Sequence, residues 1–370
     1  MLFLWGDMMK VKLGDVCEIV SGTTPKSNCP EYWNGELNWI TPAELNDDIV
    51  VVNESQRKIT TKAVIDSNLR SFPAGTVLLS SRAPIGKVAI AGKEMYCNQG
   101  FKNLICSDFI YNKYLFYFLK SKVAYLNSLG RGATFKEISK TIVENIQINL
   151  PKKEEQYKIV YILDKIIEII SLRQQQLKKL DELVKSRFIE MFGDAQVNPR
   201  NFTIMPWEKV FFTTTGKLDS NAMVEDGQYP FFTCAKEIFK IDTYAFDCEA
   251  LLLAGNNAAG IYDVKYYKGK FNAYQRTYVL RLTNSRWSYQ LFKKQLEDKL
   301  LYLQTKSKGT NTRYLTMGIL KELQFLVPPI ILQNEFAYFV EQTDKSKLEI
   351  QKSLDKLEIL KKSLMQQYFG

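Results

Sequence analysis

The residue types that could carry out chemistry in this chain of 370 residues do not include histidine. Without an imidazole there can be no Ser-His-Asp or Cys-His nucleophilic site, no histidine general base and no mixed Cys/His zinc site. The cysteines contain no C-x-x-C pair, which excludes a zinc ribbon and a thioredoxin-type motif. We therefore expect free, mostly buried thiols in a reducing cytoplasm. The six cysteines are Cys17, Cys29, Cys97, Cys106, Cys234 and Cys248.

Three short segments resemble catalytic motifs but lack the residues that the chemistry needs. Gly255–Gly260 has the glycine spacing of a phosphate loop, yet Ile261 and Tyr262 follow where Lys and Ser or Thr are required. The tripeptide Asp263-Val-Lys265 is nuclease-like but has no upstream Pro-Asp. The only Pro-Pro pair follows a valine, so the segment with which an amino-methyltransferase holds a flipped base is missing. The sequence thus assigns no catalytic and no metal-ligating residue.

Charge and side-chain type favour a polyanionic partner. The chain has 50 Lys and Arg against 40 Asp and Glu, a net charge of +10, and a pI near 9.0, which is typical of proteins that bind nucleic acid. Lys and Arg can contact phosphates, while Arg, Asn and Gln can pair with base edges. Any one of these residues can equally be a solvated surface charge. The candidate DNA-binding residues are Lys26, Asn28, Arg82, Lys87, Gln99, Lys102, Arg131 and Lys136 in the first half, and Lys217, Asn221, Asn256, Asn257, Lys265, Arg276, Lys306, Lys308 and Arg313 in the second. Tyr32, Trp33 and Lys268 are interleaved with them on the predicted loops.

An internal duplication organises the elements that would position these residues. The sequence matches itself without gaps at an offset of 177 residues, over about sixty positions. Matched residues include Gly132 and Gly309, Pro151 and Pro328, Gln156 and Gln333, and Gly193 and Gly370. The period is too long for a solenoid, so the chain is predicted to contain two copies of one larger unit.

Each copy ends in a predicted long helix that begins at a proline and ends near a glycine. About 40 residues at 1.5 Å each give ~60 Å, far more than one small domain needs. Apolar residues spaced by three and four predict a coiled-coil seam. Arg173 interrupts the first seam, and Thr343 and Lys347 make the second one polar near its start. Two unrelated amphipathic helices are the alternative. The predicted seam residues are Ile159, Leu163, Ile166, Ile170, Leu177, Leu180 and Val184 in the first helix, and Ile350, Leu354 and Leu357 in the second.

The order of elements predicts the topology. If the two seams pack on each other, the second helix runs back along the first, which gives an antiparallel coiled coil and a pseudo-twofold relation between the halves. The globular parts carry short apolar runs separated by turn residues, with local helices at about 111–128 and 288–303, which predicts α+β domains with a small mixed or antiparallel sheet. The predicted domains are 10–150, 151–193 (first long helix), 194–327 and 328–370 (second long helix).

The start of the chain contains no targeting signal that can be recognised. Its first apolar run is too short for a signal peptide, and no stretch approaches the ~18 apolar residues of a membrane span. Translation could begin at Met1, Met8 or Met9. We expect a cytoplasmic protein without a membrane partner.

Several longer segments resemble one known family. They are Val11–Pro25, Tyr32–Thr41, Leu79–Gly86 and Cys97–Phe101, together with the repeated tails from Ile148 to Gln156 and from Phe325 to Gln333. Over residues 10–370 the chain resembles the specificity subunit of type I restriction-modification systems. Its first ten residues do not look like the usual start of that family, and the second globular part keeps fewer of the marks.

The resemblance implies a function for each part. The two globular parts would be target-recognition domains, each reading one half of a bipartite site in double-stranded DNA. The helices would set the spacing and dock two methyltransferase subunits, and motor-nuclease subunits would join that core. S-adenosylmethionine, ATP and Mg²⁺ would then bind to the partner subunits, and this chain would be non-catalytic.

Two functions of other classes remain open at this point. A coiled-coil protein-interaction adaptor would bind protein without DNA specificity. A self-sufficient DNA-modifying enzyme would transfer methyl groups or cut DNA alone, which the missing motifs disfavour. The DNA target and the spacer length depend on loop geometry and DNA deformability, so they cannot be read from the sequence.

Overall fold

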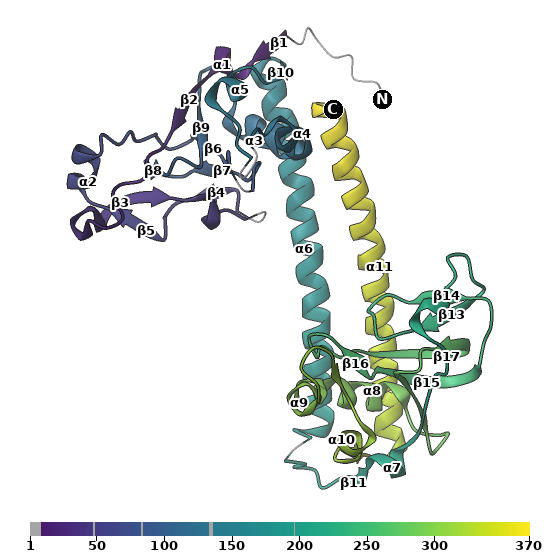
Figure 1. Ribbon diagram of the computed structural model, residues 1–370. Helices are drawn as coiled ribbons and strands as arrows, with labels where there is room; N and C mark the ends of the chain where they lie inside the picture. The colour runs from purple at the N-terminus through teal and green to yellow at the C-terminus, as the bar shows by residue number, and fades with distance from the viewer. Residues whose placement is uncertain (1–8, 47–48, 83, 133–135, 196) are drawn as a thin grey trace. The chain divides into compact units, whose positions relative to one another are not determined.

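The structure is a computed structural model that describes residues 9–46, 49–82, 84–132, 136–195 and 197–370 (Figure 1). Two of the possible starts, Met1 and Met8, lie outside these residues. The chain divides into a first unit, Met1–Arg173 with Ser353–Gly370, and a second unit, Gln174–Lys352. These units divide the long helices in their middle, whereas our predicted domains separate the helices from the globular parts, so the predicted boundaries remain a prediction.

The first unit is α+β. A five-stranded sheet has the order β2-β9-β6-β7-β4, and a three-stranded sheet has the order β5-β3-β8. Each contains one parallel pair among antiparallel ones, which confirms the mixed sheet. The strands are β2 (Cys17–Ser21), β3 (Trp33–Ile40), β4 (Val51–Val52), β5 (Arg57–Ile59), β6 (Val77–Leu79), β7 (Val88–Ala91), β8 (Tyr96–Cys97) and β9 (Lys102–Cys106). The short helices are α1 (Leu13–Val16), α2 (Thr61–Asp66), α3 (Asn112–Ser121), α4 (Val123–Leu129) and α5 (Lys140–Glu144), with 3-10 turns η1 (Pro30–Tyr32) and η2 (Pro42–Glu44).

The second unit repeats this plan with one larger sheet, whose strand order is β12-β18-β15-β17-β13-β14. Its core is rich in buried aromatic rings, among them Trp207, Phe211, Phe292 and Phe325. The strands are β12 (Phe211–Thr215), β13 (Tyr229–Phe232), β14 (Phe239–Ile241), β15 (Phe246–Ala254), β16 (Asn256–Asn257), β17 (Val264–Ala273), β18 (Thr277–Leu282) and β19 (Arg313–Tyr314). The short helices are α7 (Trp207–Val210), α8 (Tyr289–Asp298), α9 (Leu300–Lys306) and α10 (Met317–Lys321), with the 3-10 turn η3 (Ser220–Ala222).

A strand pair closes each globular part where the chain enters and leaves it. β1 (Met9–Lys12) pairs antiparallel with β10 (Gln147–Leu150), and β11 (Thr203–Pro206) pairs antiparallel with β20 (Gln324–Val327). The chain therefore enters and leaves each globular part at neighbouring strands, next to the start of a long helix.

The offset of 177 relates every helix and strand from α3 to α6 (Lys153–Phe192) to an element of the second half. It relates α3 to α8, α4 to α9, α5 to α10 and β10 to β20, with both ends of each pair in register. The two helices predicted at about 111–128 and 288–303 are thus present, but each is broken, at Lys122 and at Lys299. The duplication read from the sequence is therefore a duplication of structure.

The long helices are α6 (Lys153–Phe192) and α11 (Ile330–Phe369), two residues inside the predicted prolines (Figure 1). Gly193 ends α6 with a φ of +78°, a conformation in which a side chain would be strained. In the first unit the start of α6 packs beside the end of α11, for Ile159, Leu163 and Phe369 share one core. In the second unit the end of α6 packs beside the start of α11, through Phe188 and Phe336. Within both units the helices therefore run antiparallel, as predicted.

The predicted seam is the buried side of these helices. Ile159, Leu163, Ile166, Ile170, Val184 and Leu354 are buried, and Leu177, Leu180, Ile350 and Leu357 are half-buried. Of the polar seam residues, Thr343 is buried and donates to the Phe339 carbonyl at 2.9 Å. Lys347 forms an ion pair with Asp181 at 2.6 Å. The ends of the seam are aromatic, which the three-and-four spacing did not indicate.

A buried glutamine ties the start of each long helix to the globular part. The Gln156 side chain accepts from the Tyr111 N–H at 2.7 Å and donates to the carbonyls of Phe109 and Pro151. At the matched position, Gln333 accepts from the Ser288 N–H at 3.0 Å and donates to the Pro328 carbonyl at 2.8 Å. Both glutamines are fully buried. The repeated Pro and Gln of the sequence are thus parts of one repeated joint.

Two findings bear on cysteine and membrane. All six cysteines are free, as predicted, but only Cys17 and Cys97 are buried and the other four are half-buried, so the predicted burial is wrong for most of them. Among the described residues, no helix is long and apolar enough to cross a membrane.

Candidate nucleic-acid interface

Four of the eight candidate residues in the first unit gather around one acidic side chain. Glu137 forms ion pairs with Arg82 at 2.8 Å and with Lys102 at 3.1 Å. Its backbone pairs with that of Arg131, and Lys136 precedes it in the chain and is exposed. Glu137 thus brings together three cations that are distant in the sequence, Arg82, Lys102 and Arg131.

The cations of this group differ in exposure. The side chain of Arg82 is 44% exposed, whereas that of Lys102 is 9% exposed and its ammonium also lies near Ser81 and the Phe101 carbonyl. Burial works to raise the pKa of Glu137, but hydrogen bonds from Lys102 and Arg82 outweigh it and hold the pKa below its usual range. Lys102 therefore holds the carboxylate, and the carboxylate orients Arg82 toward solvent.

The other candidates of the first unit lie on neighbouring loops. Lys87 donates to the Pro42 carbonyl at 3.1 Å, which uses its ammonium inside the unit. Gln99 is exposed and accepts from the Thr24 hydroxyl, which ties it to the loop that carries Lys26 and Asn28. Lys26 and Asn28 are both exposed.

Aromatic residues stand beside that loop. The Trp33 indole donates to the Lys26 carbonyl at 3.3 Å, and the guanidinium of Arg57 lies 3.6 Å from the centre of the Trp33 ring. Tyr32 hydrogen-bonds to Asp66. Arg57 was not among our candidates, because nothing in its local sequence marks it. Only the pairing of β3 with β5 brings it to the tryptophan.

In the second unit two of the nine candidates, Asn256 and Arg276, line an open hollow. Asn256, Arg276, Thr312 and Tyr314 line it, and β16 and β19 form its wall through the pairs Asn256–Tyr314 and Asn257–Arg313. Within the described residues, neither the Asn256 amide nor the Arg276 guanidinium has a hydrogen bond or an ion pair. Arg276 is exposed. Thr312 and Tyr314 were not among our candidates, since that search selected cations and amides.

Some of the remaining candidates of the second unit have side chains that contact other residues of the protein, and others are exposed. Asn257 accepts from the Ala259 N–H at 2.8 Å, so its side chain shapes the loop that leads to Gly260. Lys265 is paired with Asp263 at 2.5 Å and its side chain is only 13% exposed, while Lys268 lies 3.5 Å from Glu249. Lys306 lies over the Tyr302 ring, and Arg313 donates to the Gln304 carbonyl at 3.4 Å. Lys217, Asn221 and Lys308 are exposed.

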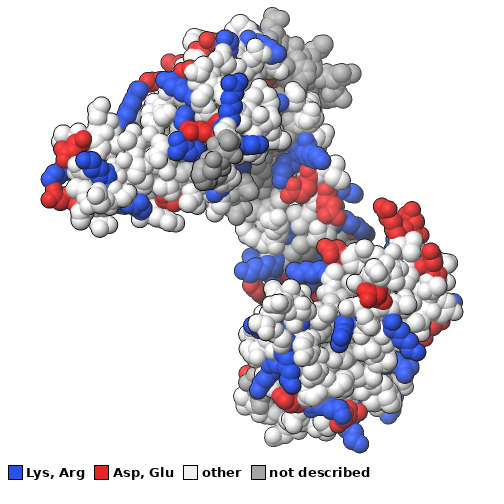
Figure 2. Space-filling view, in the orientation of Figure 1, with Lys and Arg blue, Asp and Glu red and all other residues white. Residues whose placement is uncertain are grey.

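The space-filling view shows how the charged side chains are distributed on one face of each unit (Figure 2). Lys and Arg side chains are spread over the visible face of each unit and are interspersed with Asp and Glu (Figure 2). Neither unit shows there a single continuous cationic field. On this face the arrangement therefore suits contacts by individual side chains rather than attraction by a uniform patch. Among the described residues, no three Cys, Asp or Glu side chains come together in a way that could hold a metal ion.

Named relatives support this interpretation at the level of the family. The MjaIX specificity subunit of a type I restriction enzyme from Methanocaldococcus jannaschii is 39% identical over 193 residues, which are 51% of this chain and 44% of that protein. The EcoDI specificity subunit from Escherichia coli is 37% identical over 147 residues, 39% of this chain and 31% of that protein. This chain thus spans less than half the length of these two relatives. The EcoprrI specificity subunit from Escherichia coli is 23% identical over 357 residues, 90% of this chain and 86% of that protein.

Solved structures share the fold. The crystal structure of the S subunit of a type I restriction-modification system from M. genitalium has a TM-score of 0.66 at 16% identity, over 98% of this chain and 96% of that chain. A chain from a structure that describes complex assembly and conformational transition of the type I system has a TM-score of 0.59 at 17% identity, over 100% and 99%. The model of the type I restriction modification DNA specificity domain matches twice, at residues 6–182 and 201–360. This chain therefore belongs to the family of type I restriction-modification DNA specificity proteins.

Proposed function

We propose that this chain is the DNA-recognition subunit of a type I restriction-modification complex and that each unit reads one half of a bipartite target in double-stranded DNA. The observation that carries the proposal is one scaffold built twice, with different side chains on its loops. Arg82 and Asn256 occupy equivalent places, as do Glu137 and Tyr314, since both pairs are joined by the same antiparallel bridge. Two related readers of this kind suit a target with two unlike halves.

The long helices carry the second part of the proposal, which is the docking of two methyltransferase subunits. Tyr161 and Tyr338 lie 177 residues apart, and they are 64% and 66% exposed. Exposed tyrosines at the same place in both copies are typical of interface anchors, because Tyr is enriched at hot spots. Two equal copies of one partner would use them in the same way. Motor-nuclease subunits would join through the methyltransferase core.

The third part concerns the chemistry. The missing histidine and the incomplete phosphate, nuclease and methyltransferase motifs favour a non-catalytic chain. S-adenosylmethionine, ATP and Mg²⁺ would bind to the partner subunits, and the complex would act in the cytoplasm.

Methylation sequencing tests the whole proposal. The full chain is expressed together with its methyltransferase subunit in a host without other modification systems, and each protein is also expressed alone. We expect one bipartite methylated motif that requires both proteins. If the chain binds partners but no motif appears and no DNA is retained, it is an adaptor. If the chain alone methylates or cuts DNA, it is an enzyme in its own right.

A further inference from the structure

The backbone hydrogen bonds around the hollow of the second unit recur at the equivalent place in the first unit. The Gly255 N–H donates to the Arg276 carbonyl at 2.9 Å, and the Ser81 N–H donates to the Gly100 carbonyl at 2.7 Å. The Leu315 N–H donates to the Gly255 carbonyl at 2.8 Å, and the Ile138 N–H donates to the Ser81 carbonyl at 3.1 Å.

A second pair of backbone hydrogen bonds also recurs beside each site. The backbones of Lys308 and Tyr314 exchange two hydrogen bonds, as do those of Arg131 and Glu137. These four residues are again related by 177. The two sites therefore have one backbone frame, and its positions can be compared one by one.

Three positions of this frame carry different side chains in the two units. The first unit has Arg82, Gly100 and Glu137 where the second has Asn256, Arg276 and Tyr314. In the first unit the guanidinium belongs to Arg82 and is held by Glu137. In the second unit the guanidinium belongs to Arg276, at the position of Gly100, and Asn256 places an amide at the position of Arg82. A frame that is kept while its polar side chains are exchanged is what two recognition sites for different bases require.

We propose that this backbone frame carries the base-reading site of each unit. In the second unit Arg276 and Asn256 contact base edges, while Tyr314 and Thr312 form the wall. In the first unit Arg82 contacts a base edge and Glu137 is its positioning residue. An arginine can donate two hydrogen bonds to guanine O6 and N7, and an asparagine can pair with adenine N6 and N7. Within the described residues, the side chains of Arg276 and Asn256 have no hydrogen bond or ion pair. No hydrogen bond within the protein therefore has to be broken before these side chains contact DNA.

This inference rests on the proposed function, and the experiment separates the two. The methylated motif is first determined with the unaltered chain and its methyltransferase subunit. The second step repeats the measurement with R276A, R276K and N256A, and with R286A as the control. Arg286 is exposed in the same unit and does not line the hollow.

We expect R276A to relax one position of one half-site, with discrimination at that position reduced by about tenfold or more. The other half-site and the gap stay unchanged. R276K keeps the charge but not the paired donors, so it should relax the same position, and N256A should relax a position in the same half-site. R286A should leave the motif unchanged. Thermal unfolding of each variant checks that it is folded.

An unchanged motif with R276A and N256A overturns the inference. A uniform weakening at all sequences also overturns it, because it would make Arg276 a phosphate contact. If the unaltered chain directs no motif at all, it is the proposed function that fails.

Discussion

A few residues of the first unit have two tasks in our proposal, because Lys102, Glu137 and Arg82 belong both to the fold and to the proposed recognition face. A buried ammonium is costly without a partner. Glu137 supplies that partner, and its second oxygen is then free to hold Arg82. The ion pair that stabilises the buried Lys102 thus also orients the surface side chain of Arg82.

A substitution of Glu137 separates these tasks. E137Q keeps the shape but leaves Lys102 without its carboxylate, so the free energy of unfolding should fall by about 1–3 kcal/mol at pH 7. The pKa of Glu137 is lowered in the folded chain. Its contribution to stability is therefore complete above the ordinary carboxyl pKa of about 4.3 and is lost as the pH falls through the lowered value. Urea unfolding at pH 7 and at pH 3 measures both effects.

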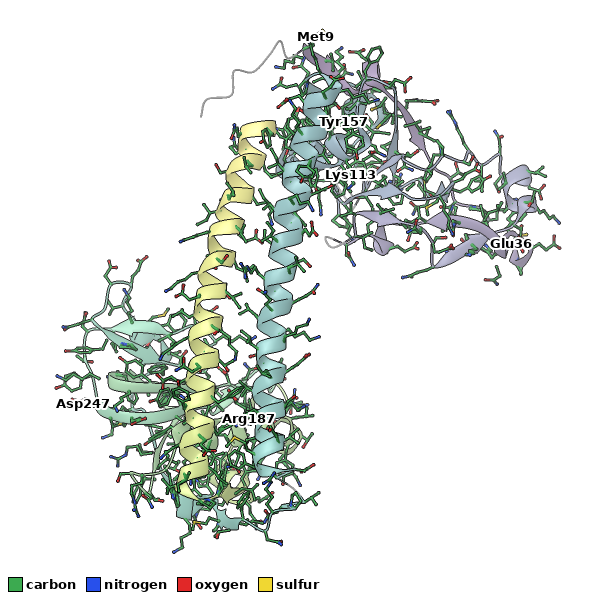
Figure 3. The ribbon with its side chains drawn as sticks, turned by 180° about the vertical axis from the view of Figure 1, so that it is seen from behind. Met9, Glu36, Lys113, Tyr157, Arg187 and Asp247 are labelled. Carbon is green, nitrogen blue, oxygen red and sulfur yellow. The ribbon has the colours of Figure 1, made fainter. Side chains whose placement is uncertain are left out.

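The control is E36Q, because Glu36 is exposed in the same unit, on β3 (Figure 3). It should change the urea midpoint little at either pH. An E137Q deficit that persists undiminished at pH 3 would show that the charge is not its cause.

The candidate site could be predicted from the sequence only by residue type. Selecting cations and amides found Arg82, Asn256 and Arg276, but it also selected Lys265, whose ammonium is used by Asp263 two residues away. It missed Tyr314, which carries no such signal. Glu137 partners Arg82 across 55 residues, and such pairings are created by the sheet rather than by local sequence.

At the scale of elements the repeated joint between globular part and helix is the feature to test. Q156A would leave the Tyr111 N–H and two carbonyls without their partner. Buried groups without partners cost about 1–3 kcal/mol each, so the three groups together should cost at least about 3 kcal/mol in the unit concerned. Q333A should act in the same way on the second unit.

Hydrogen exchange locates these effects. Q156A should speed exchange at Tyr111 and in the strands around it, and Q333A at Ser288, while each leaves the other unit protected. Q174A, at an exposed glutamine of α6, is the matched control. Equal changes in all three variants would contradict the role of the joint.

The exposed tyrosines of the long helices allow a test of stoichiometry. Y161A and Y338A should each remove one of two bound methyltransferase subunits, and the double variant both, as measured by native mass spectrometry. Because both side chains are exposed, the unfolding of the free chain should change by less than about 0.5 kcal/mol. Y125A, at a tyrosine that is 48% exposed on α4, is the control. Full occupancy in the double variant would place the docking surface elsewhere.

At the scale of the molecule, duplication and helices were the most predictable features. A heptad-like seam and a proline at each start are local signals, and they placed both helices to within two residues. The break at Lys122 was not predictable, since its neighbours are ordinary helix formers. The extra three-stranded sheet of the first unit depends on pairing between distant segments, which composition does not report.

The closed strand pairs predict that a globular part can be exchanged as a block. Replacing residues 203–327 by the equivalent stretch of another family member cuts the chain where β11 and β20 lie side by side. We expect one half of the methylated motif to change and the other to stay. DNA affinity should fall steeply with salt in both proteins, because phosphate contacts release counterions. Affinity that does not depend on salt, or a change in both halves, would contradict this division.

The last prediction concerns distance. If the helices set the gap between half-sites, their length should be readable in the motif. Four residues inserted after Gln174, and four after the matched Gln351, add ~6 Å to each helix near its middle. At about 3.4 Å per base pair, the gap should grow by about two base pairs. Both half-sites should keep their bases, since neither proposed base-reading site is altered.

Two further insertions make the test specific to helix length. Four residues disturb the seam register, whereas seven restore it, so seven-residue insertions at the same two places should lengthen the gap by about three base pairs with less loss of stability. Four residues inserted in the loop at Arg286 lengthen the chain but not the helices and should leave the gap unchanged. The gap is measured by methylation sequencing. A gap that ignores the helix insertions, or that follows the loop insertion equally, would mean that the helices hold the units without measuring the distance between them.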